Sequence, residues 1–235
     1  MVDDFAARVT GLGALAEPAR RALYEFVVAQ PDAVSRDEAA ERCDLPRHSA
    51  KFHLDRLVEV GLLEVEFRRL SGRTGPGAGR PAKLYRRAAR NVSVSLPERR
   101  YDLAGHVLAD AVERSIRDGV ALGEAVGQAA STRGHDLARS LRPGLDPCAR
   151  ESDRLARVLA AQGYEPRESG AELLLENCPF DALARDHTEL VCSMNLSLVK
   201  GVVDEIGCTG LEAVLEPDPD RCCVRARCPD QDGPD

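Results

Sequence analysis

The sequence predicts a mainly α-helical protein with an α+β C-terminal part. Three observations carry this prediction. Apolar residues recur at helical spacing in three short stretches between residues 19 and 61, and in a longer stretch between residues 101 and 141. After residue 163, short stretches broken by Gly and Pro predict strands on both sides of one more helix. With 235 residues, of which 43% are hydrophobic, the chain can bury the cores of two ordinary domains.

Three helices are expected in the first 61 residues. The first is Ala19–Ala29, with Pro18 suited to its first turn. The second is Ser35–Arg42, because its serine hydroxyl and an acid three residues later can satisfy each other's free backbone donors. The third ends at Gly61, which fits a left-handed C-terminal cap. The short connection between the second and third helices is what a helix-turn-helix requires, in which the N-terminal half of the later helix enters the major groove of DNA.

The start of the third helix offers polar side chains opposite its apolar face. The candidates for contact with base edges are Arg47, His48, Ser49 and Lys51. A solvated helix surface is the alternative interpretation of the same four residues.

A β-hairpin is expected directly after this helix. Residues 62–67 alternate as a strand does, residues 82–87 form a second candidate strand, and residues 71–81 are a Gly- and Pro-rich tip. The hairpin contributes three further candidate DNA contacts, Arg73, Arg80 and Lys83. The thin Gly-Arg-Pro element around Arg80 suits insertion into a narrow minor groove or contact with a phosphate. A flexible linker is the alternative.

The charge of the chain divides between its halves. Residues 1–100 hold 18 Lys and Arg against 14 Asp and Glu, whereas residues 101–235 carry a net charge of −11. Within the first half, the stretch Arg68–Arg100 contains ten basic residues and a single acid. This asymmetry predicts an anion-binding module joined to an acidic one, and nucleic acid is the favoured anion over a merely solvated basic surface.

The first ninety residues resemble the winged-helix domain of the ArsR-like bacterial repressors. The resemblance rests on three stretches, Leu15–Arg21, Phe52–Leu63 and Gly79–Tyr85. It implies a winged helix-turn-helix that binds double-stranded operator DNA as a homodimer on two-fold sites.

The rest of the chain is expected to form a helical region and an α+β region. The predicted domains are 1–95 (DNA binding), 96–147 (helical linker and dimerisation) and 148–235 (sensory domain). The long helical stretch carries Leu108, Val112, Ile116 and Val120 on one face, for which core packing and a dimer seam remain equal alternatives. Beyond it, the sequence predicts a helix near residues 151–162, a hairpin over 164–177, a helix over 188–206 and two short strands around residues 217–220.

Eight cysteines need an explanation, and seven of them lie from residue 148 onward. No Cys-x-x-Cys pair occurs, so neither a zinc ribbon nor a thioredoxin-like motif fits. Four cysteines are expected on different elements or at their boundaries, namely Cys178, Cys192, Cys208 and Cys223. If these four converge, they suit an iron–sulfur cluster, but zinc and an inert buried core are alternatives that spacing alone leaves open.

The cysteine-bearing part is similar to the sensory domain of the SufR-type repressors, which govern iron–sulfur (suf) assembly operons. The similarity rests on Asn177–Phe180, His187–Cys192 and Cys222–Val224. It implies that Cys178, Cys192, Cys208 and Cys223 hold an iron–sulfur cluster, with a 4Fe–4S cluster favoured over 2Fe–2S. Cys222 is a rival for Cys223, because neighbours in a strand face opposite ways. His187 is a second rival ligand, although a surface or capping role suits it better.

Several other classes of protein are disfavoured. No stretch approaches the roughly 20 apolar residues of a membrane span, and the acidic N-terminus is unlike a secretory signal, so a cytoplasmic location is expected. No nucleophile elbow, P-loop, dinucleotide fingerprint or His-Glu-x-x-His occurs, so an enzyme is not expected. A zinc- or thiol-redox-responsive regulator is the main alternative, and a thiol or metal enzyme module carried by a DNA-binding scaffold is a further one.

Overall fold

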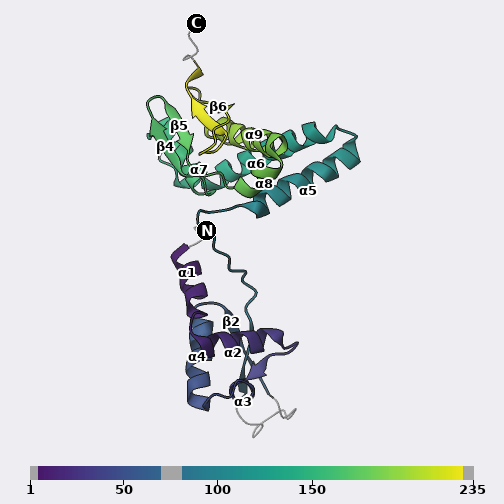
Figure 1. Ribbon diagram of the computed structural model, residues 1–235, viewed down its shortest axis with the longest axis vertical. Helices are drawn as coiled ribbons and strands as arrows, with labels where there is room; N and C mark the ends of the chain where they lie inside the picture. The colour runs from purple at the N-terminus through teal and green to yellow at the C-terminus, as the bar shows by residue number, and fades with distance from the viewer. Residues whose placement is uncertain (1–4, 70–80, 230–235) are drawn as a thin grey trace. The chain divides into compact units, whose positions relative to one another are not determined.

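The structure is a computed structural model that describes residues 5–69 and 81–229. It consists of two compact units, Met1–Val94 and Ser95–Asp235 (Figure 1). Within the described residues the fold is mainly α-helical, with a small antiparallel sheet in each unit, which confirms the predicted fold class. The segment 96–147, predicted as a separate region, packs within the second unit. No helix of the described ranges is both long and apolar enough to cross a membrane.

The first unit is built from short helices followed by a hairpin. Its elements are α1 (Phe5–Ala14), α2 (Pro18–Ala29), β1 (Val34–Ser35), α3 (Arg36–Arg42), α4 (Arg47–Glu59), β2 (Leu63–Arg68) and β3 (Ala82–Arg87). The predicted caps are present, since the Ser35 hydroxyl accepts a 3.1 Å hydrogen bond from the Glu38 backbone N–H and Gly61 has a left-handed φ of 74°. Helix α1 and the two-residue strand β1 were not predicted.

The core of the first unit lies between its helices and a three-stranded antiparallel sheet. The sheet has the order β1-β3-β2, and Val65 on β2 pairs with Tyr85 on β3. Leu23 of α2 and Leu54 and Leu57 of α4 are fully buried in this core. Burying each of these side chains contributes about 1.5–3 kcal/mol, so packing of the apolar faces fixes how α4 is presented.

The second unit begins with two helices where the sequence predicts one continuous helical stretch. Helix α5 (Tyr101–Asp118) ends at Gly119, which adopts a left-handed φ of 69°, and α6 (Leu122–Leu141) follows. The Gly119 N–H still donates to the Ser115 carbonyl, but its left-handed conformation turns the following residues out of the helix, so the hydrogen-bond ladder ends there. The predicted apolar face of this stretch is split accordingly. Val107 is buried, whereas Val112 and Ile116 are 45% and 79% exposed.

The remaining elements of the second unit form a four-stranded antiparallel sheet and three helices. They are α7 (Glu151–Ala160), β4 (Pro166–Ser169), β5 (Glu172–Leu175), α8 (Asp181–Asp186), α9 (Thr188–Ile206), β6 (Glu212–Leu215) and β7 (Val224–Arg227). The strand order is β4-β5-β7-β6. The predicted hairpin, the helix over 188–206 and the two last strands are present. Helix α8 was not predicted.

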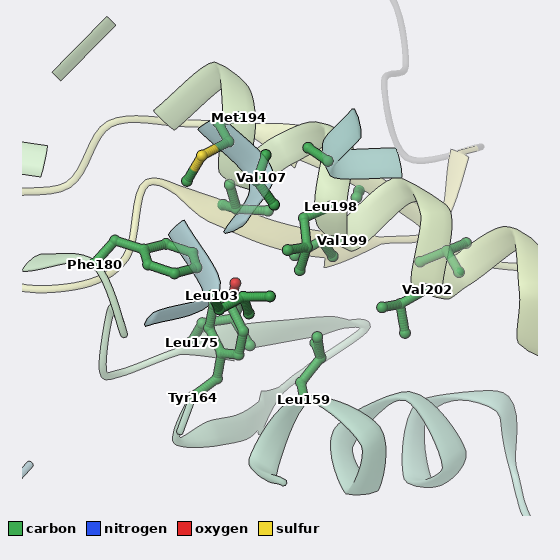
Figure 2. Packing of buried hydrophobic residues seen from close by; sticks show 14 of the residues in the cluster. Leu103, Val107, Leu159, Tyr164, Leu175, Phe180, Met194, Leu198, Val199 and Val202 are labelled. Carbon is green, nitrogen blue, oxygen red and sulfur yellow. The ribbon is translucent and has the colours of Figure 1, made fainter. Parts of the chain in front are cut away.

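Helices α6 and α9 run parallel and pack closely in the core of the second unit. A Cβ atom on Gly134 would overlap the carbonyl oxygen of Leu198, and one on Gly201 would overlap that of Ser131. The absence of both side chains therefore lets the two backbones approach. Figure 2 shows Leu198, Val199 and Val202 of α9 packed among the other buried residues of this core, with Tyr164 and Phe180 nearby.

Candidate functional site

The exposed face of α4 carries most of the predicted DNA contacts. Arg47 and His48 are exposed in its first turn and Ser49 is half-buried, while Lys51 is exposed one turn later. Positions 48, 51, 52 and 55 follow the helical repeat, so their side chains share one face. That face also holds Phe52, which is 64% exposed and was not among the predicted contacts. An exposed aromatic ring beside basic residues suits contact with a thymine methyl group.

Asp55 joins this helix to the wing strand. Its carboxylate lies 2.7 Å from the ammonium of Lys51 and 2.6 Å from that of Lys83 on β3. The hydroxyl of Tyr85 donates a 3.0 Å hydrogen bond to the same carboxylate. Although partial burial acts in the opposite direction, the hydrogen bonds from Lys51, Lys83 and Tyr85 lower the pKa of Asp55 to about 2. Two predicted DNA contacts thus share one acidic partner, which sequence periodicity gave no reason to single out.

The structure describes only some of the remaining predicted DNA contacts of the first unit. Arg47 lies 3.6 Å from the carboxylate of Asp37 on α3, yet its side chain is 74% exposed. Arg73 and Arg80 lie outside the described residues. Arg47, His48, Ser49, Lys51 and Lys83 are therefore available on the surface formed by α4 and β3, and their role in DNA binding stays a prediction.

In the second unit, three of the cysteines lie close to one another, and one of them, Cys178, is part of the β5–α8 loop. Cys178 follows β5, and Cys222 and Cys223 precede β7. The last two were predicted to lie on the final strand, but that strand begins only at Val224. A hydrogen bond with the Cys222 thiol, together with burial, raises the pKa of Cys178. For Cys222, the bond from Cys178 lowers the pKa, but the bond with Cys223 and burial outweigh it and bring the value to about 12. The three thiols therefore lie close enough together to influence one another's pKa.

A buried polar chain supports this thiol group from α9. The Asn195 side chain, 1% exposed, donates a 3.2 Å hydrogen bond to the sulfur of Cys222. The hydroxyl of Tyr164 donates a hydrogen bond to the side-chain oxygen of Asn195. Burial, followed by the nearby Cys222, Cys178 and Cys223, raises the pKa of Tyr164, so this residue is a neutral donor at physiological pH. Neither Asn195 nor Tyr164 was predicted as a site residue.

The four predicted ligands are not brought together as one set. Cys192 lies in the second turn of α9 and Cys208 follows the end of that helix. An α-helix rises about 1.5 Å per residue, so the stretch from Cys192 to Ile206 spans about 20 Å. Two thiolates on one zinc lie within about 5 Å of each other, since each Zn–S bond is about 2.3 Å, and an iron–sulfur cluster adds only a few Å. The prediction that Cys192 and Cys208 share a site is therefore wrong for this structure.

Cys208 has its own surroundings at the start of α7. Its sulfur lies 3.7 Å from the backbone oxygen of Glu151, and burial followed by the Glu151 carboxylate raises its pKa to about 11. Of the neighbours Cys222 and Cys223, Cys222 is the more buried, with 6% exposure. His187, the rival ligand, is the exposed residue that precedes α9.

Cys192 lies on α9 close to Asn195, the residue that donates to Cys222. It precedes Asn195 by three residues, so the two side chains share a face of the helix, about one turn apart. Cys192 is buried, with 6% exposure. Within residues 5–69 and 81–229, no group of three or more His, Cys, Asp or Glu side chains is arranged so that it could hold a metal ion. Thiolates are nonetheless the ligands that an iron–sulfur cluster or zinc prefers, and the neighbouring Cys178, Cys222 and Cys223 supply that type of donor.

The first unit has the fold of a winged helix-turn-helix, the class of domain that DNA-binding transcription regulators use. Comparison with protein families agrees, since the model of the Helix-turn-helix domain matches residues 15–66, which span α2, α3, α4 and part of β2. Neither the curated proteins nor the solved structures give a significant match. The chain therefore carries the domain of a helix-turn-helix transcription regulator at its N-terminal end.

Proposed function

We propose that this protein is a cytoplasmic, homodimeric repressor that senses iron–sulfur status and controls an iron–sulfur (suf) assembly operon. One observation carries the proposal. A helix-turn-helix domain and a group of three neighbouring cysteines, Cys178, Cys222 and Cys223, of which Cys222 is buried, occur in separate units of one chain. A DNA-binding unit joined to a thiol-bearing unit is the composition expected of a sensor that regulates transcription.

The ligand set that we propose differs from the one that the sequence suggested. It consists of Cys178, Cys192, Cys222 and Cys223, and Cys208 is left out because α9 separates it from Cys192. Four thiolates are the usual ligands of a 4Fe–4S cluster. A bound cluster would be lost from the protein on exposure to oxygen or when iron is short. The chain itself buries Cys192 and Cys222 and directs the Asn195 amide at Cys222.

The DNA-binding role rests on the surface formed by α4 and β3. Arg47, His48 and Lys51 are exposed where a recognition helix contacts base edges, and Lys83 extends the same surface. Arg73 and Arg80 are proposed to add phosphate or minor-groove contacts. In a homodimer two such surfaces would meet two half-sites of an operator. The acidic second unit would contribute little to DNA affinity, since its charge repels phosphate.

The test of the sensor is purification of the full chain without oxygen, followed by visible absorption and by iron and sulfide analysis. We expect a brown protein with close to four irons and four sulfides per chain. Cys178→Ser and Cys222→Ser should be colourless, whereas Cys208→Ser, the matched control, should keep the colour. If the wild-type protein is colourless and contains zinc, the cofactor is zinc and not an iron–sulfur cluster. A protein with neither metal would refute the cofactor.

The test of the DNA-binding role starts from duplexes selected by the wild-type protein from a random pool. We expect a two-fold symmetric site. Arg80→Ala should weaken binding to all duplexes and reduce the salt dependence of the affinity, because a lost phosphate contact releases about one counterion fewer. Arg47→Ala should also change the preferred sequence. A pool that yields no enriched sequence would contradict the role.

A thiol-redox regulator is the second candidate, and the contact between Cys178 and Cys222 favours it. Hydrogen peroxide would oxidise the two thiols to one disulfide, with both thiol protons and both peroxide oxygens leaving as two molecules of water. The expected signs are a loss of two hydrogens by mass spectrometry and a change of DNA affinity that dithiothreitol reverses. If peroxide leaves the thiols of the metal-stripped protein unlinked, this candidate is refuted.

A further inference from the structure

The segment that leads from the first unit into α5 is fastened to the loop that carries Cys178. The second unit begins at Ser95, and α5 begins at Tyr101. Between them, the Arg100 backbone N–H donates a 2.9 Å hydrogen bond to the carbonyl of Pro179. The connecting segment 95–100 and the cysteine loop 177–181 are therefore in direct contact, within one unit.

Arg99 makes the most extensive of these contacts. Its guanidinium donates to the side-chain oxygen of Asn177 and, over 3.0 Å, to the backbone carbonyl of Cys178. The same group lies 3.6 Å from the carboxylate of Asp181. The Arg99 side chain is 20% exposed, so these bonds are largely shielded from water. A planar guanidinium presents its donors in a rigid fork, so it holds these three acceptors in a fixed geometry that the rotating ammonium of a lysine would not impose.

Asn177 completes the connection from the loop side. It is 6% exposed, and its amide nitrogen donates to the carbonyls of Glu98, over 3.0 Å, and of Gly163. Because every polar atom of this buried side chain is bonded, the loop cannot shift without breaking at least one of these bonds. An unsatisfied buried polar group costs about 1–3 kcal/mol. The connecting segment and the cysteine loop should therefore move together.

We propose that Arg99 is a positioning residue that couples the chemical state of Cys178 to the segment connecting the two units. The residue whose carbonyl Arg99 binds is the one whose sulfur is a proposed cluster ligand. Ligand binding at that sulfur fixes the backbone of Cys178. Through the hydrogen bonds that Arg99 and Asn177 make, this constraint also restricts the motion of residues 95–100. The segment then sets which arrangements of the winged-helix unit are populated. This inference rests on the proposed function.

The test compares cluster-loaded and chelator-stripped full-length protein. In the wild type we expect DNA affinity to differ at least tenfold between the two forms, and amide hydrogen exchange in residues 95–101 to differ at least tenfold. In Arg99→Gln we expect the affinity ratio to fall to within twofold of one, although iron and sulfide content match the wild type. Arg139→Gln, which removes the same charge from an exposed ion pair with Glu205, should keep the wild-type ratio.

Each outcome has one meaning. If the wild type switches and Arg99→Gln switches equally, the coupling is refuted and the proposed function stands. If the loaded and stripped wild-type proteins bind DNA equally, the sensing function fails and the coupling fails with it. If Arg99→Gln does not hold the cluster, the wild-type exchange data decide. Unchanged exchange in residues 95–101 overturns the coupling, and a tenfold change supports it.

Discussion

Asp55 on α4 and Lys83 on β3 form a 2.6 Å ion pair that joins the recognition helix of the winged-helix unit to its wing strand. Lys51 and Tyr85 bind the same carboxylate, so four side chains from two elements converge at one point. The wing strand and the helix are thereby held in one register on the surface proposed to meet DNA.

Acid should weaken the first unit through this carboxylate. The pKa of Asp55 falls from 3.8 to about 2 in the folded chain, so its contribution to stability is complete above pH 3.8 and is lost as the pH falls toward 2. After allowance for its 32% exposure, the contribution is on the order of 1 kcal/mol. Urea unfolding of the full chain, followed by the NMR signals of Leu54 and Tyr85, measures it. Asp55→Asn should unfold more easily at pH 7 and lose this pH dependence, whereas Asp32→Asn, in an exposed loop, should retain it.

Phe52 should contribute to DNA specificity without contributing to salt dependence. Its ring is 64% exposed on the face of α4 that carries His48 and Lys51. Loss of an apolar base contact costs about 1–2 kcal/mol and involves no phosphate. In filter binding with the selected duplex, Phe52→Ala should weaken affinity about tenfold with an unchanged salt slope, whereas Lys51→Ala should reduce the slope by about one. Phe5→Ala, on α1, is the control. A lower slope for Phe52→Ala would contradict this role.

Local signals in the sequence predicted most elements, and the misses have a physical cause. The Ser35 cap and Gly61 were sufficient to locate the ends of α3 and α4, because caps act within one turn. Helix α8, of six residues, has no such signal. The sequence left open whether the helical stretch bends at Gly119, because a glycine can either continue a helix or end it, and the choice depends on how α5 and α6 pack. Periodicity likewise could not tell which half of the apolar face is covered.

The candidate site was predicted less well than the fold. The pairing of Cys208 with Cys192 could have been questioned from the sequence, since the predicted helix 188–206 extends about 20 Å beyond Cys192 before Cys208 is reached. The expectation that only one of Cys222 and Cys223 faces inward assumed that both lie on a strand, but the strand begins only at Val224. Asn195 and Tyr164 could not have been found, because nothing in their local sequence marks the polar chain that they form across the core.

The close approach of α6 and α9 should make Gly134 sensitive to any side chain. A Cβ atom there would overlap the Leu198 carbonyl oxygen and lie 3.0 Å from the Val202 nitrogen, so the helices would have to separate. Gly134→Ala should lower the free energy of unfolding by about 1–3 kcal/mol, the usual cost of overpacking. Gly127→Ala is the control on the same helix. Its Cβ would lie at an ordinary 3.6 Å from the Ser197 hydroxyl, and alanine should gain up to about 1 kcal/mol in helix propensity. Equal effects of both changes in urea unfolding would show that the close approach is unimportant.

Tyr164 should stabilise the second unit through one buried hydrogen bond. Its hydroxyl donates to the Asn195 side chain, which in turn donates to Cys222. Tyr164→Phe keeps the ring against Phe180 but leaves the Asn195 oxygen without its donor in a site that water does not reach. We expect a loss of about 1–3 kcal/mol in urea unfolding, because an unsatisfied buried acceptor bears its desolvation cost alone. Tyr101→Phe removes a hydroxyl that is 3.4 Å from the Ala182 nitrogen on a side chain with 41% exposure, and it should cost far less. If the two variants are equally stable, the polar chain does not stabilise the unit, and its role is confined to orienting the amide at Cys222.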